Sequence, residues 1–86
     1  MDTNNLKAFI AVAQTGSFSG AALQLHLTQP AVSKRISVLE SQLNSQLFDR
    51  IGRNVNLTEA GNTLLPRAKK ILLEVEDTTR ALSTLS

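Results

Sequence analysis

The sequence predicts a mainly α-helical domain with three helices, a short two-stranded β-hairpin and a long helix at the C-terminal end. Apolar residues recur at helical spacing in three segments that precede residue 44. Between residues 46 and 57 the apolar residues recur at a shorter spacing, which is typical of two short strands. A stripe spaced by fours and threes then begins at Leu64 and indicates a long helix with one apolar face. The 86 residues suffice for one small domain with a modest core.

The composition excludes several classes of protein. With 42% hydrophobic and 19% charged residues, the chain has the balance of a folded globular domain. No apolar run reaches the length of a membrane span, and the first residues, MDTNNLK, lack the basic and apolar regions of a secretory signal. Cysteine is absent, which excludes disulfides and thiolate metal ligands and fits a reducing cytoplasm.

The charge is distributed unevenly along the chain. Residues 1–73 contain eight Lys and Arg against four Asp and Glu, whereas residues 74–86 contain one Arg against three acids. The net charge of +2 therefore combines a basic body with an acidic end. Such a basic excess is compatible with a polyanionic partner but does not require one.

The first two helices are predicted from their caps and their apolar spacing. The first begins after Asp2 or Thr3 and ends near Gly16, and the second begins after Ser17. The apolar positions of the first helix are Leu6, Phe9, Ile10 and Ala13. Those of the second, shorter helix are Phe18, Ala21, Ala22 and Leu25. The two alanines allow another helix to approach closely.

The third helix has an unusual outward face. Thr28 is its predicted N-cap after a tight connection through His26 and Leu27, Pro30 lies in its first turn, and Asn44 ends it. Its buried stripe is Val32, Ile36, Leu39 and Leu43. The opposite side carries small or polar residues, namely Pro30, Ser33, Lys34, Ser37 and Ser41. Serine does not favour helix, so a purely solvent-exposed face would more often carry Glu and Lys.

A hairpin and a long helix complete the predicted domain. The strands are expected at residues 47–50 and 55–57, joined by residues 51–54, and Thr58 is expected to cap the last helix with Glu59 at its positive end. The apolar stripe of that helix is Leu64, Ala68, Ile71, Val75, Thr78, Leu82 and Leu85. This spacing predicts a dimer through the last helix, although the stripe alone fixes neither orientation nor the number of strands.

A short helix, a tight turn and a helix with a small polar outer face are typical of the helix-turn-helix that places its second helix in the major groove of DNA. Gln29 and Ser33 could then bond base edges, and Lys34 could reach guanine or a phosphate. The basic hairpin would lie beside this helix as a wing. Arg50 and Arg53 flank Gly52 there, and arginine in a narrow minor groove responds to groove shape.

These motifs resemble a known family. The segment GSFSGAALQLHLTQPAVSKRISVLESQLNSQLFDRIGRNVNLTEAG is similar to the N-terminal DNA-binding segment of LysR-type transcriptional regulators, which have a winged helix-turn-helix and a linker helix. The elements GSF, AA, TQPAVS, LE, LF.R..R and LT.AG stand in register, and the similarity covers most of residues 1–65. Beyond Pro66 it rests on helical character and position alone.

The resemblance implies a bacterial, cytoplasmic, nucleoid-associated regulator without a cofactor or a metal, which binds double-stranded DNA with two-fold symmetric half-sites. It implies a winged domain over residues 1–58 and a linker helix over residues 59–86, whose antiparallel pairing makes a homodimer and, in a full-length protein, allows a tetramer. The matching positions for base and backbone contacts are Gln29, Pro30, Ser33, Lys34 and Ser37. Arg53 matches the wing contact, and Thr28, Arg50 and Thr58 match positions nearer the phosphates.

Three features depart from the family pattern. Asn44 stands where the family usually has Gly, and Lys34 where it often has Arg. A lysine ammonium lacks the planar fork with which arginine makes a bidentate contact to guanine. Family members also continue into an effector-binding domain, whereas this sequence ends at Ser86. We therefore expect a truncated chain without an inducer site.

Other interpretations are less well supported. The serines could form a plain solvent face, and Arg50 and Arg53 could keep a hairpin edge soluble. His26 is expected to be a turn residue, because no second His or Cys lies at metal-binding spacing, and nothing places Asp49 or Asp77 near it as a catalytic partner. We therefore predict no enzymatic activity.

The lack of Trp and Tyr argues against single-stranded nucleic acid. The remaining alternative is a winged module that binds protein and dimerises through its last helix, which salt dependence would distinguish from DNA binding.

Overall fold

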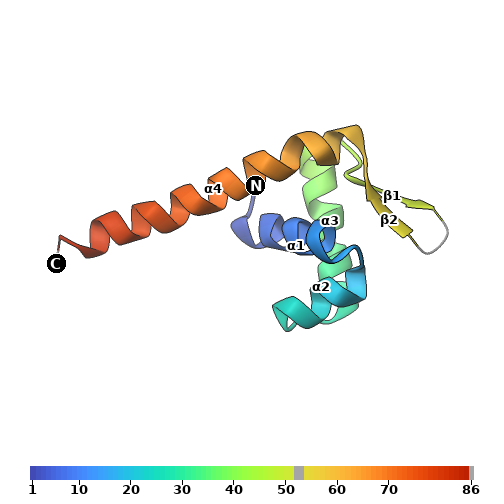
Figure 1. The fold of residues 1–86 in the computed structure, drawn as a ribbon, viewed down its shortest axis with the longest axis horizontal. Helices are drawn as coiled ribbons and strands as arrows, with labels where there is room; N and C mark the ends of the chain where they lie inside the picture. Colours follow the sequence, from blue (N-terminus) through green and yellow to red (C-terminus); the bar gives the residue numbers. More distant parts are fainter. Residues whose placement is uncertain (52–53, 86) are drawn as a thin grey trace.

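The computed structural model describes residues 1–51 and 54–85, with the backbone alone at residues 50 and 51. The elements follow the predicted order (Figure 1): α1 (Thr3–Thr15), α2 (Phe18–Leu25), α3 (Gln29–Leu43), β1 (Phe48–Ile51), β2 (Asn54–Leu57) and α4 (Glu59–Ser83). In Figure 1, α2 and α4 lie on opposite sides of α1, and the hairpin projects from the end at which α4 begins. The predicted fold class, a winged helix-turn-helix with a long last helix, is confirmed.

Local side-chain caps begin all four described helices. The side chains of Asp2, Ser17, Thr28 and Thr58 accept hydrogen bonds from backbone N–H groups two or three residues further along. Such caps satisfy donors that the first turn of a helix leaves unpaired. The predicted helix starts are therefore confirmed, and Asp2 is the cap of the first helix.

Left-handed residues end the first three helices. Gly16, His26 and Asn44 have φ values of 74°, 56° and 50°. After α2 the N–H of Leu27 donates to the carbonyl of Ala22 at 2.9 Å, and after α3 the N–H of Ser45 donates to that of Glu40 at 3.1 Å. This six-to-one bond closes a helix end and turns the chain sharply. His26 and Asn44 therefore hold the turns in which we predicted them.

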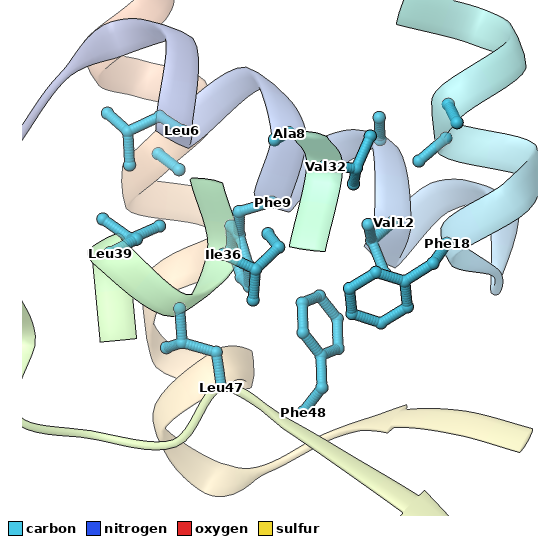
Figure 2. Packing of buried hydrophobic residues seen from close by; sticks show 14 residues of the cluster. Leu6, Ala8, Phe9, Val12, Phe18, Val32, Ile36, Leu39, Leu47 and Phe48 are labelled. Atoms are coloured by element: carbon cyan, nitrogen blue, oxygen red, sulfur yellow. The ribbon is translucent and has the colours of Figure 1, made fainter. Parts of the chain in front are cut away.

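Three phenylalanines meet at the centre of the core. Phe48, from β1, lies 5.4 Å from Phe9 of α1 and 6.1 Å from Phe18 of α2, measured between ring centroids. Figure 2 shows Leu47 and Phe48 reaching from the hairpin side toward the helices. Leu47 is only 1% exposed. The hairpin is thus anchored by its own first residues, which join the core formed by α1, α2 and α3.

The hairpin differs slightly from the prediction, because β1 covers residues 48–51 and not 47–50, and β2 begins at Asn54, one residue earlier than predicted. Phe48 pairs with Leu57 and Ile51 pairs with Asn54 in an antiparallel register. The two strands are therefore joined by residues 52–53, whereas we predicted a connection over residues 51–54. Ile51 is itself apolar and its partner Asn54 is polar, which is possible because strand hydrogen bonds do not depend on side-chain hydrophobicity.

Helix α4 has two structurally different halves. Ala68 is fully buried in the core, and Leu64, Leu65, Ile71 and Leu72 pack against that core. The first half of α4 thus completes the domain that we expected to end at residue 58. Beyond Leu72 the described residues of the helix are exposed. Figure 1 shows this second half running past the N-terminus and away from the rest of the molecule.

Candidate nucleic-acid interface

The helix-turn-helix consists of α2, the turn through His26 and α3. Ala21 and Ala22 of α2 are buried, and Val32 and Ile36 of α3 are buried in the same core. The small alanine side chains let the two helices pack closely, as the sequence predicted. This packing fixes which side of α3 faces outward.

The outward side of α3 gathers most of the predicted contact residues. Gln29, Pro30, Lys34 and Ser37 are exposed there, next to the exposed cap Thr28. Ser33 is only half-buried, so it lies at the edge of this surface and not at its centre. We call Thr28, Gln29, Pro30, Ser33, Lys34 and Ser37 the α3 face. The sequence-based prediction missed one neighbour, Val38, which is 38% exposed and interrupts the otherwise polar set.

The start of α3 is electrically positive. Its first turn, which is fully described, contains no acidic side chain, and Pro30 occupies it. The Thr28 hydroxyl accepts a hydrogen bond from the N–H of Ala31 at 3.2 Å. The backbone amides and dipole at such a helix start attract anions, and Lys34 adds a cation one turn later. By contrast, α4 carries Glu59 in its first turn.

Thr58 has a different position from Thr28. Its hydroxyl donates to the carbonyl of Gln46 at 2.6 Å and accepts from the N–H of Gly61 at 3.1 Å. Its own N–H donates to the carbonyl of Leu47 at 3.0 Å. Both hydrogen-bond donors of Thr58 are therefore engaged inside the domain. The direct role of this residue is to join the hairpin to α4, and a phosphate contact would require one of these bonds to break.

Glu40 fastens α3 to the residue that precedes the hairpin. One of its carboxylate oxygens accepts a hydrogen bond from the N–H of Leu47 at 2.7 Å. A charged acceptor makes such a bond stronger than an ordinary backbone bond. In the sequence, Glu40 stands out only as part of the LE element. Its role could not be read from the residues, because the bond spans seven positions and a change of chain direction.

Arg35 also faces away from the α3 face. Its guanidinium donates to the carbonyl of Asn4 in α1, at 3.5 Å. This long bond ties the middle of α3 to the first turn of α1. Lys34, which we predicted as a contact residue, is therefore the exposed cation on the outward side of the described helix.

The two predicted wing arginines are outside what the structure describes in side-chain detail. The backbone of Arg50 pairs with Val55 in the hairpin. Arg53 and the Arg50 side chain lie outside the described residues. Their predicted contacts with DNA remain predictions.

The predicted dimerisation stripe is divided between the core and the surface. Ala68 is 0% exposed, so it serves the core of its own chain and offers no surface to a second one. Leu64 and Ile71 are partly buried against the same core. Val75, Leu82 and Leu85 are 46%, 63% and 80% exposed, and Thr78 between them is exposed as well. Only this second half of the stripe consists of exposed residues.

Two other kinds of feature are absent from the described residues, a metal site and a membrane span. Over residues 1–51 and 54–85, no group of three or more His, Asp or Glu side chains is placed to hold a metal ion. Among the helices in that part of the chain, none has both the length and the apolar character needed to cross a membrane.

Comparison with known proteins decides the family. The family described as "Bacterial regulatory helix-turn-helix protein, lysR family" matches residues 3–62. The chain belongs to the LysR family. This confirms the resemblance that the motifs predicted, and it assigns the chain to a family of transcriptional regulators, which is not a family of enzymes.

Relatives and solved structures agree with the LysR assignment. An uncharacterized HTH-type transcriptional regulator from the ibpB-leuC intergenic region of Azotobacter vinelandii is 66% identical over all 86 residues, which span 60% of its length. The regulator YbhD of Escherichia coli K12 is 42% identical over 77 residues, or 90% of this chain and 24% of YbhD. This LysR chain thus spans only part of these relatives.

Two solved LysR structures match almost the whole chain. The CbnR DNA-binding domain in complex with DNA has a TM-score of 0.89 and 36% identity, with 100% of both chains covered. The BenM domain in complex with catB site 1 DNA has a TM-score of 0.93 and 33% identity, covering 99% of this chain and 96% of that one. The LysR likeness therefore includes α4, where the sequence resemblance rested on helical character alone.

Proposed function

We propose that this chain is the DNA-binding part of a bacterial transcriptional regulator, and that it binds a specific double-stranded site as a dimer. Helix α3 enters the major groove and the β1–β2 hairpin lies along the minor groove. The observation that carries this proposal is the α3 face, which is mostly exposed, built of small and polar side chains, and free of acids in the first turn of the described helix. The CbnR and BenM domains, which are similar in structure, were solved as DNA complexes and support it.

Base recognition is assigned to four side chains of the α3 face and to their neighbour Val38. The amide of Gln29 can bond the paired donor and acceptor of adenine, and the hydroxyls of Ser33 and Ser37 can bond donors or acceptors on any base edge. Lys34 reaches guanine acceptors or a phosphate. Val38 offers an apolar contact for a thymine methyl group. Small side chains matter here because bulkier ones would hold the helix out of the groove.

Phosphate contacts are assigned to the edges of that surface. The hydroxyl of Thr28 and the first amides of α3 face the backbone beside the groove. Pro30 shapes this turn and packs against sugar and phosphate. Arg50 and Arg53 neutralise phosphates and enter the minor groove from the hairpin. We assign Thr58 to positioning the hairpin, since its donors are already used.

Dimerisation is assigned to the exposed half of α4, through Val75, Thr78, Leu82 and Leu85. Leu64 and Ile71 border this surface from the core side. A single domain offers one recognition helix and few phosphate contacts, whereas two domains in fixed geometry select a site with two-fold symmetry. We place such a regulator in the bacterial cytoplasm, at the nucleoid.

The decisive experiment is selection of bound duplexes from a random pool, followed by a salt titration on the selected site. We expect a two-fold symmetric sequence. A dimer that neutralises about six phosphates should lose about 10³ in affinity between about 50 and 200 mM salt, because binding releases counterions. If no duplex were enriched, or if the affinity for duplex DNA did not change with salt concentration, the alternative of a protein-binding module would be favoured. Apolar docking between proteins does not carry that salt dependence.

A further inference from the structure

A hollow of about 330 Å³ lies between α3 and the hairpin. It is lined by Phe18, Ile36, Glu40, Gln46 and Phe48. The side chains of Phe18, Ile36 and Phe48 are buried and lie next to one another in Figure 2, so they form its floor. Glu40 is half-buried and Gln46 is exposed. The polar side chains therefore lie nearer the solvent, at the mouth of the hollow.

The side chain of Gln46 is held in place although the residue is exposed. Its Nε2 atom donates a hydrogen bond to the backbone carbonyl of Phe48 at 3.0 Å. Its own backbone carbonyl accepts the Thr58 hydroxyl at 2.6 Å, which fixes the main chain at the same residue. A glutamine amide has two N–H donors. Over the described part of the chain, the carbonyl of Phe48 uses one of them, and the other is available to a partner outside the domain.

The position of the hollow determines which part of the DNA passes over it. In the proposed complex, α3 lies in the major groove and the hairpin lies along the minor groove. Adjacent major and minor grooves of a duplex are separated by one sugar-phosphate strand, so that strand must cross between α3 and the hairpin. The hollow lies at this crossing. Phosphate oxygens accept hydrogen bonds from side-chain amides as well as from cations.

We propose that Gln46 binds a phosphate of the strand that separates the two grooves, through the second hydrogen of its Nε2 atom. This rests on the proposed function and adds a contact residue outside the α3 face and the wing arginines. Because the bond to Phe48 already orders the side chain, little conformational entropy is lost when the phosphate binds. A phosphate contact is the same for every base sequence, so Gln46 sets the position of the strand and the affinity, and not the base preference.

Glu40 limits the strength of this contact. Its carboxylate belongs to the lining of the same hollow and places negative charge beside the strand. The N–H of Leu47, which donates to the carboxylate at 2.7 Å, offsets part of that charge. The remaining charge repels phosphates. The strand is therefore held at the mouth of the hollow by Gln46 and does not settle onto the floor.

The test is a double-mutant cycle between Gln46 and individual phosphates of the selected duplex, each replaced in both half-sites by an uncharged methylphosphonate. Gln46→Ala should weaken binding to the unmodified duplex about tenfold, because a hydrogen bond to a charged group is lost. At one phosphate between the central half-site and its flank, the replacement should weaken the native chain at least about threefold more than the variant, as expected for groups in contact. An equal loss for both chains at every phosphate would overturn the proposal.

A charge placed at the same position gives a second readout. Gln46→Lys should tighten binding and steepen the dependence of log affinity on log salt by about 1 for each half-site, because another phosphate is neutralised. Gln42→Lys adds the same charge on another side of α3 and is the matched control, which should act clearly less. Circular dichroism checks that each variant is folded. If the two lysine variants behaved alike, net charge alone would explain the result and the contact at Gln46 would be wrong.

The acid in the hollow gives a third readout. Glu40→Gln keeps an acceptor for the Leu47 N–H and removes the charge, so it should tighten binding about threefold at low salt and less at high salt. Unchanged or weaker binding, with the Leu47 amide still protected from hydrogen exchange, would show that the strand does not cross this hollow. A native chain that selects no duplex would overturn the proposed function itself. A selected duplex without coupling to any phosphate would overturn the Gln46 contact alone.

Discussion

The backbone carbonyl of Leu47 lies directly against the Cα of Gly61. A Cβ atom at residue 61 would collide with that carbonyl and would come within 2.8 Å of the Cδ2 atom of Leu57. The same carbonyl accepts the N–H of Thr58 at 3.0 Å, so it cannot move aside without losing that bond. Gly61 therefore allows α4 to start against the hairpin, and this explains the glycine in the LT.AG element.

The first prediction concerns this contact. Gly61→Ala should lower the free energy of unfolding by about 1–3 kcal/mol, although alanine favours helix by about 1 kcal/mol, because overpacking against backbone outweighs propensity. Urea denaturation followed by circular dichroism measures the change. The control is Asn62→Ala at the exposed neighbouring position, which should be near neutral. An unchanged midpoint for Gly61→Ala would contradict the close contact.

The second prediction concerns the bond between Glu40 and Leu47. Glu40→Ala should cost about 1–3 kcal/mol, because it leaves the Leu47 N–H without its acceptor in a part-buried position. Glu40→Gln keeps an acceptor at the same place and should cost clearly less. Hydrogen exchange at the Leu47 amide gives a local readout, and protection should fall in the alanine variant. If the Leu47 amide exchanged at the same rate in the Glu40→Ala and Glu40→Gln variants, the bond from Glu40 would not be what holds the hairpin.

The third prediction tests the α3 face. Ser37→Glu should lower affinity for the selected duplex by about tenfold or more, because it brings a carboxylate against phosphates at an exposed site. Ser33→Glu should act in the same direction, but Ser33 is half-buried and its effect on stability must be measured beside its effect on binding. Gln42→Glu adds the same charge on another side of α3 and is the control. Normal affinity in the Ser37 variant would exclude this face from the groove.

The fourth prediction concerns the wing. Arg53→Ala should weaken binding, lower the slope of log affinity against log salt by about 1, and flatten the preference for A·T-rich flanks. Reading of the central half-site should change little, because the minor-groove pattern is degenerate. Duplex selection with the variant measures both effects. Loss of discrimination at the central positions instead would place Arg53 in the major groove.

The fifth prediction tests the exposed half of α4. Val75→Asp with Leu82→Asp should raise the dimer dissociation constant at least about a hundredfold, since two apolar contacts are replaced by charges that would be desolvated. Sedimentation measures this, and binding to a symmetric site should fall to weak half-site binding. Ile71 is not a suitable target, because it also packs against the domain core. Leu73→Asp, on another side of the helix, is the control; a dimer that survives the double variant would place the interface elsewhere.

Much of the fold could be predicted because its signals are local. The caps Asp2, Ser17, Thr28 and Thr58 act on backbone groups two or three residues away, so helix starts follow from short stretches of sequence. The exposed face of α3 followed in the same way from the helical period. The pairing of Ile51 with Asn54 did not, because backbone hydrogen bonds form there whatever the side chain, and Asn54 lacks the apolar side chain that marks a strand.

The features of the fold and the site that were not predicted depend on contacts between segments that are distant in the sequence. A stripe of apolar residues shows that one side of a helix is covered, but it does not show by what. Ala68 and Val75 occupy equivalent positions in the predicted heptad, yet Ala68 is buried in its own domain and Val75 is 46% exposed. The Glu40 bond to Leu47 is likewise a product of the folded arrangement. The wing arginines stay predictions from sequence and family.

The continuity of α4 from Glu59 to Ser83 has a consequence for how half-site spacing is measured. Its 25 residues make a rod about 37 Å long that is clamped to the domain only at its first half. A tilt of about 10° in the free second half, which is about 17 Å long, moves the far end by about 3 Å, close to one base-pair step of about 3.4 Å. In the proposed dimer, a small change in the angle between the domain and α4 would therefore change the spacing between half-sites that the dimer binds. A force applied at the end of α4 would change which operators are bound, without altering any base-contacting residue.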